Sequence, residues 1–207
     1  AMGVPPVLAN GTNCLGLVPG SVSGAYTFRD VLDRRAGRWG LLVAVFAMAG
    51  ALLVLALPSE VFSAAVPWLI LLAVALVGLQ PLLLKHLPAP DARSSTVALS
   101  GSGFYGGYFG AGQGIAFLAA LAASGVTDIH EANGFKNVLA GVANSAAAIV
   151  FVIGGQVLWS AAAVLAVSSL LGGWIGGRIT RRLPASALRA LVIIVGVVAA
   201  ISAFLGD

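Results

Sequence analysis

With 207 residues, of which 59% are hydrophobic and 9% charged, the chain is too apolar for a water-soluble domain, where about 25% of residues are charged. The net charge of +4 does not indicate nucleic acid here, because Lys and Arg gather in the cytoplasmic loops of membrane proteins. One cysteine and two histidines exclude a disulfide framework and a recognisable metal motif, so we expect neither a metal nor a cofactor.

Seven hydrophobic segments are expected, since about 20 apolar residues cross a bilayer. In chain order they are 7–27, 39–57, 61–84, 96–124, 132–153, 158–177 and 185–205. A basic loop, a polar linker and a second basic loop, at 28–38, 85–95 and 178–184, separate groups of them. The sequence therefore predicts an all-α, multi-pass protein of the cell (inner) membrane, with the lipid bilayer as its surroundings.

Two related halves, 1–90 and 91–207, are indicated by a weak internal repeat. Ala9-Asn10-Gly11 matches Ala132-Asn133-Gly134, and Trp39 opens a segment in one half as Trp159 does in the other. Such symmetry is typical of transporters. The first half has no counterpart of 96–124, and the chain opens with Ala-Met-Gly in mid-pattern. We therefore expect two four-segment halves, of which the first lacks its Gly-rich segment through a truncated start.

The stretch Ser100–Gly114 contains seven glycines in fifteen residues. Glycines at 103/107, 106/110 and 110/114 are four residues apart, which favours close helix packing. The same glycines also allow a discontinuous helix that directs backbone N–H groups at a ligand. Tyr105, Tyr108 and Gln113 would add side-chain donors. Both interpretations remain open at this point.

The cationic residues distinguish two paths for this Gly-rich segment. If it crosses the membrane, the Arg residues of 178–189 lie opposite those of 29–38 and Lys85. If it enters and returns as a re-entrant hairpin, ten of the eleven basic residues face one side, and only Lys136 lies elsewhere. The positive-inside rule favours the hairpin and hence inverted halves. A spanning segment is the simpler alternative.

Lys136 is a charged residue inside an otherwise apolar segment. Asn133, Lys136/Asn137 and Asn144 recur at helical spacing and share one face. A buried ammonium is costly unless it faces a cavity or a partner, so this face predicts a pocket for an anion. Alternatively, Lys136 reaches the interface or pairs with Glu131 or Asp128.

The polar junction before that face offers two further interpretations. Asp128, His130 and Glu131 could relay protons, but a helix N-terminal cap is the better-supported role. In the first half, the equivalent face carries only uncharged polar residues, Asn10, Thr12, Asn13 and Ser21.

Four motifs resemble those of the TauE/SafE sulfite-exporter family. They are GFYGGYFGAGQGI at 103–115, ANGFKNVLAGVANSAAAIVF at 132–151, ANGTNCLGLVPGSVSG at 9–24 and GGRITRRLP at 176–184. The resemblance implies two four-helix repeats and transport of small anions, often sulfur-containing ones such as sulfite or organosulfonates.

We therefore expect a permease that transports a small anion, sulfite or an organosulfonate, by alternating access at the interface of the two halves. The predicted substrate-binding residues are Lys136, Asn133, Asn137, Asn144, Gly110, Gly112, Gln113, Tyr105, Tyr108, Asn10 and Asn13. A non-transporting membrane scaffold is the alternative, and a homo-oligomer is compatible with either. An enzyme is not expected, because paired intramembrane carboxylates, a His cluster and a Ser/His/Asp arrangement are all missing from the sequence.

Overall fold

The computed structural model describes residues 3–27, 30, 32–85 and 91–179, together with 190, 193, 194, 197, 198 and 200–202. Across these ranges the regular elements are helices, as predicted. They are α1 (Pro6–Thr27), α2 (Arg35–Ala56), α3 (Ser59–Lys85), α4 (Ala92–Tyr108), α5 (Gln113–Ala123), α6 (Ile129–Ile153) and α7 (Trp159–Ile179). The expected segment 185–205 lies mostly outside the described residues.

Three stretches within the described helices are long and apolar enough to cross a membrane, judged by length and composition. They are Arg35–Ala56, Ser59–Leu79 and His130–Ile153. The segment expected at 96–124 is instead two shorter helices, α4 and α5. Nothing in the structure tests the proposed repeat or its boundary, which stay predictions.

The polar linker is shorter than the predicted 85–95, because α3 extends to Lys85 and α4 already begins at Ala92. The Asp91 carboxylate accepts the Ser94 N–H at 3.0 Å and caps α4. This hydrogen bond and further ones from backbone N–H groups hold the pKa of Asp91 below its usual value, because they stabilise the ionised carboxylate. The cap therefore ends the linker early.

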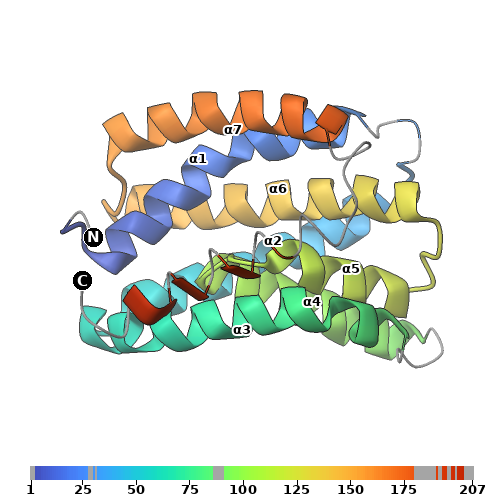
Figure 1. Cartoon of the computed structure of the whole chain (residues 1–207), viewed down its shortest axis with the longest axis horizontal. Coiled ribbons are helices and arrows are strands. Elements are labelled where there is room, and N and C mark those ends of the chain that lie inside the picture. The colour runs from blue at the N-terminus through green and yellow to red at the C-terminus, as the bar shows by residue number, and fades with distance from the viewer. Residues whose placement is uncertain are drawn as a thin grey trace.

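Helix α6 is the centre of the bundle and contacts α1, α2, α4 and α5. In Figure 1, α7, α1 and α6 follow one another from the top of the view, and α3, α4 and α5 lie below them. Helices α1 and α6 are antiparallel, since Gly11 lies against Phe151 and Gly24 against Asn137. Helices α1 and α7 run parallel, with Gly16 against Leu165.

Two apolar clusters divide the interior along α6. Phe135 and Leu139 belong to the first, with residues of α2, α4 and α5. Ala147 and Phe151 belong to the second, with residues of α1, α2 and α3. Asn144, which is only 3% exposed, lies on α6 between them. A buried amide at this level requires polar partners.

Candidate functional site

The Gly-rich segment is broken between Tyr108 and Gln113. Gly110 and Gly112 have φ angles of 78° and 72°, a left-handed conformation that glycine adopts without strain. The Ser95 hydroxyl, at the start of α4, donates to the carbonyl oxygen of Ala123, at the end of α5, over 3.1 Å. Helices α4 and α5 therefore form an antiparallel hairpin that returns to the end of the bundle where it began.

The glycines of this segment serve two different purposes. A Cβ on Gly107 would lie 1.9 Å from the Ala47 carbonyl oxygen, and one on Gly103 would lie 3.0 Å from that of Val43. These two glycines form a close contact between α4 and α2, as the four-residue spacing predicts. Gly110 and Gly112 instead produce the break. The two interpretations of the sequence thus apply to different residues.

Two side chains hold the broken backbone in place. The Asn10 amide donates from Nδ2 to the Tyr108 carbonyl oxygen over 3.0 Å, and the Tyr105 hydroxyl donates to that of Ala111. The ring of Tyr108 packs edge-on against Phe62, with centroids 5.6 Å apart. Asn10, Tyr105 and Tyr108 therefore support the break, and none of the three lines the cavity beside it.

A cavity of about 420 Å³ lies between this break and helices α1, α6 and α7, and we call it the polar cavity because amide and hydroxyl side chains are among its lining. Its lining residues are Leu17, Gly20, Ser21, Gly110, Gly112, Gln113, Gly114, Asn137, Ala140, Asn144, Ser169, Gly172 and Gly173. None of these carries a charge. The structure thus brings together five of the predicted site residues, Gly110, Gly112, Gln113, Asn137 and Asn144.

The Gln113 and Asn144 amides form the buried side of this cavity. Gln113 donates from Nε2 to Asn144 Oδ1 over 3.0 Å. The remaining Gln113 oxygen is buried without a hydrogen-bond partner among the described residues, and it faces Gly106. Because Asn144 uses its oxygen as the acceptor, its Nδ2 remains the donor that it can offer to the cavity.

Lys136 lies beside the cavity and is not part of its lining. Its ammonium donates to Asn133 Oδ1 over 2.9 Å. A Cβ on Gly114 would lie 3.5 Å from Lys136 Cδ, so the lysine stem runs along the first turn of α5. The alternative pairing of Lys136 with Glu131 or Asp128 is not found among the described residues. Asn13 is half-buried on α1 and also lies outside the lining.

The acidic residues of the junction have other partners. The Asp128 carboxylate accepts the N–H groups of His130 and Glu131 at 3.0 Å and 2.8 Å, which confirms the cap. Glu131 pairs with Arg35. The Arg35 guanidinium lies 5.4 Å from the ring centroid of Trp39 and 5.1 Å from that of Phe135. These contacts join the starts of α2 and α6.

Ser169 and the small residues around it were not among the predicted site residues. The Ser169 hydroxyl donates to the Gly16 carbonyl oxygen over 2.7 Å and accepts the Gly20 N–H at 3.2 Å. Pro19 lies inside α1 at this point. A Pro-Gly pair inside a hydrophobic segment is a sequence signal that could have pointed to this region. A serine on α7 carries no such local signal.

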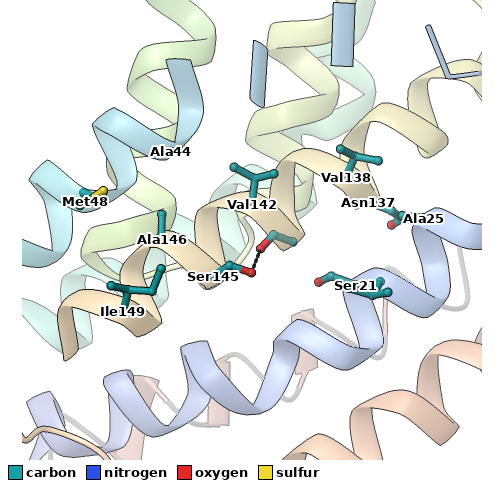
Figure 2. A pocket seen from close by; sticks show the side chains of 12 residues that line it. Ser21, Ala25, Ala44, Met48, Asn137, Val138, Val142, Ser145, Ala146 and Ile149 are labelled. Atoms are coloured by element: carbon teal, nitrogen blue, oxygen red, sulfur yellow. Dashed lines mark hydrogen bonds between the residues drawn. The ribbon is translucent and has the colours of Figure 1, made fainter. Parts of the chain in front are cut away.

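A second, apolar cavity of about 480 Å³ lies on the other side of the α1–α6 contact, lined from α1, α2 and α6. Figure 2 shows Val138, Val142 and Ile149 of α6 lining it, with Met48 of α2 across from them. Ser21 and Asn137 line both cavities. The contact between α1 and α6 therefore separates the two cavities.

A family model described as sulfite exporter TauE/SafE matches residues 1–203. The chain belongs to the TauE/SafE family. A probable membrane transporter protein of Haemophilus influenzae is 31% identical over 93% of this chain and 78% of its own length. The probable membrane transporter protein YfcA of Escherichia coli is 27% identical, with 96% and 76% covered. The probable membrane transporter protein ORF9 of a Sinorhizobium species is 28% identical, with 96% and 78% covered. No solved structure matches the chain significantly.

Membership of the TauE/SafE family identifies the chain as a multi-pass membrane transporter with a small-molecule substrate. It confirms the resemblance noted in the sequence and does not favour the scaffold alternative. The cavity at the broken helix is the candidate site for that substrate.

Proposed function

We propose that this protein carries a small anion, sulfite or an organosulfonate, through the polar cavity between α1, α6, α7 and the α4–α5 break. The observation that carries the proposal is the set of uncharged donors around a cavity inside an apolar bundle. Asn137 and Asn144 contribute amide groups, Ser21 a hydroxyl, and the break its glycine backbone.

The donors at the break favour negative charge. Helix α5 begins at Gln113, and the first N–H groups of a helix have no acceptor within that helix. The Gln113 and Ile115 N–H groups bond within the break, whereas that of Gly114 has no acceptor among the described residues. The α5 dipole directs its positive end toward the same cavity. An anion there replaces its hydration with fixed donors.

The α4–α5 hairpin is proposed to be re-entrant and to place the break within the bilayer. Its two outer ends meet at Ser95 and Ala123, near the starts of α2 and α6. Alternating access would follow from movement of the two halves around the cavity. This mechanism rests on the predicted repeat and on the discontinuous helix.

Asn144→Asp tests whether the solute is an anion. The change keeps the size of the side chain and the acceptor for Gln113, but replaces the Nδ2 donor with a carboxylate oxygen. Two like charges 4 Å apart repel by about 4 kcal/mol at an effective dielectric constant of about 20. We expect uptake of sulfite into proteoliposomes to fall at least about 100-fold.

Asn13→Asp is the matched control, because it places the same charge at a half-buried α1 amide outside the cavity. It should retain most of the uptake. Equal loss in both variants would trace the effect to the buried charge alone. Undiminished sulfite uptake by folded Asn144→Asp would refute an anion at this site, and a screen of sulfonates in the same vesicles identifies the preferred solute.

A further inference from the structure

A hydroxyl from α7 bonds to the backbone of helix α1 next to Pro19, beside the cavity. Pro19 has no N–H, and its ring disturbs the backbone of the preceding turn. The neighbouring pair, Gly16 carbonyl and Gly20 N–H, is bridged by the Ser169 hydroxyl from α7, at 2.7 Å and 3.2 Å. Insertion of a side chain into the hydrogen-bond ladder is a recognised cause of helix kinks.

Glycines allow α7 to approach α1 closely enough for this insertion. A Cβ on Gly20 would lie 2.7 Å from the Ser169 carbonyl oxygen, and one on Gly173 would lie 3.0 Å from that of Gly20. The close approach begins before Pro19, at Gly16, and continues beyond it. The turn of α1 that contains Pro19 is therefore packed closely against α7 on one side.

Beyond Pro19, α1 forms the wall between the two cavities. A Cβ on Gly141 would lie 3.1 Å from Ser21 Cβ, and one on Gly24 would lie 3.0 Å from Asn137 Nδ2. Ser21 of α1 and Asn137 of α6 line both the polar cavity and the apolar one, and Figure 2 shows both residues beside the apolar one. Small residues make this wall thin.

Ser169 lines the polar cavity but has no hydrogen to offer an anion. A serine hydroxyl carries one donor, and Ser169 directs it at backbone carbonyls, of Gly16 at 2.7 Å and of Ala166 at 3.1 Å. Its remaining acceptor capacity would repel negative charge. Its role is therefore toward α1 and not toward the solute.

We propose that Ser169 is a positioning residue whose inserted hydroxyl holds α1 at Pro19–Gly20, so that residues 20–27 form a hinged gate on the polar cavity. The part of this proposal that concerns transport rests on the proposed function. The hinge itself does not, and it is measured without any solute.

The test uses a cysteine at Ser21 as reporter in a Cys14→Ala background, with a small methanethiosulfonate reagent applied to the protein in membranes. Loss of a hydrogen bond shifts a local equilibrium about two- to tenfold. Ser169→Ala should raise the labelling rate of the reporter by that factor. Ser169→Thr, which keeps the hydroxyl, should restore the original rate. Ser168→Ala, at the exposed neighbouring position, should not change it.

Pro19→Ala supplies a second arm that does not depend on how well Ser169→Ala folds. It restores the missing N–H and lets Gly20 bond directly to Gly16, so the Ser169 hydroxyl is no longer required. In this background, adding Ser169→Ala should alter labelling by less than about twofold. An undiminished effect of Ser169→Ala there, or equal labelling of Ser169→Ala and Ser168→Ala, would overturn the hinge.

Transport measured on the Ser169 and Pro19 variants with Ser21 left intact separates this proposal from the proposed function. A gate defect lowers the maximal rate of sulfite uptake and leaves the half-saturating concentration unchanged. A raised half-saturating concentration with unchanged labelling would show that Ser169 contacts the solute, and the hinge would be rejected. Altered labelling in a protein that transports no sulfite would support the hinge and contradict the proposed transport of sulfite.

Discussion

At the scale of single residues, Lys136 shows how a charge can be near a site without lining it. Helix α6 rises about 1.5 Å per residue, so Lys136 lies about 10 Å beyond the helix start at Ile129. Its ammonium bonds to Asn133, and its stem contacts Gly114 at the rim of the cavity. We propose that it attracts the anion on its approach, while neutral donors bind it.

Lys136→Met is expected to lower sulfite uptake at subsaturating concentration about tenfold, since a fixed charge raises the local concentration of an oppositely charged solute. Lys136→Arg keeps the charge and should retain most of the rate. The measurement is the initial rate of uptake into proteoliposomes at low and high ionic strength. An equal rate for Lys136→Met and the unchanged protein would remove Lys136 from the mechanism.

At the scale of helices, the contact between α4 and α2 depends on glycines that sit on one face. Gly103 and Gly107 lie against the backbone of α2, whereas a Cβ on Gly101 would meet nothing within 4 Å. Close packing of this kind is how helices associate in lipid, where burying apolar area gains little. The contact fixes α4, and through it the break at Gly110 and Gly112.

Gly107→Ala should destabilise the protein by about 1–3 kcal/mol, because its Cβ would overlap the Ala47 carbonyl. Gly101→Ala, in the same helix, is the control. It should be neutral or stabilising by up to about 1 kcal/mol, since alanine favours helix over glycine. The thermal unfolding midpoint Tm of the detergent-solubilised protein distinguishes the two. A higher Tm for Gly107→Ala would contradict the close contact.

At the scale of the whole molecule, the hairpin brings the cationic ends of the helices together. The ion pair of Arg35 with Glu131 joins the starts of α2 and α6, and Ser95 joins the start of α4 to the end of α5. Figure 1 shows the α2–α3 and α6–α7 connections at the opposite end. We propose that the end carrying the Arg residues faces the cytoplasm, by the positive-inside rule.

Single cysteines in the Cys14→Ala background test this topology. Ala92→Cys and Thr127→Cys flank the hairpin at exposed positions, and Glu60→Cys is exposed at the α2–α3 turn. An impermeant maleimide should label the first two only from the cytoplasmic side and the third only from the other side. Labelling of residues 92 and 127 from opposite sides would mean that the Gly-rich segment crosses the membrane.

Local sequence information was enough for the helices and part of the site. Hydrophobic runs predicted α1, α2, α3, α6 and α7 to within a few residues, because each buries apolar surface along its own length. The amides at Asn137 and Asn144 share a face through helical spacing alone. The start of α4 differed from prediction, because the Asp91 cap acts over only three residues.

Composition and spacing were sufficient to predict an apolar helical bundle, since they are properties of neighbouring residues, but they left open whether the Gly-rich segment packs or breaks. Tertiary structure decided which glycines pack and which break, that Gln113 meets Asn144, and that Lys136 turns to Asn133. It also brought Ser169 into α1 from 153 residues away. Such contacts depend on which helices pack together in space, and the spacing of residues along the chain does not specify that packing.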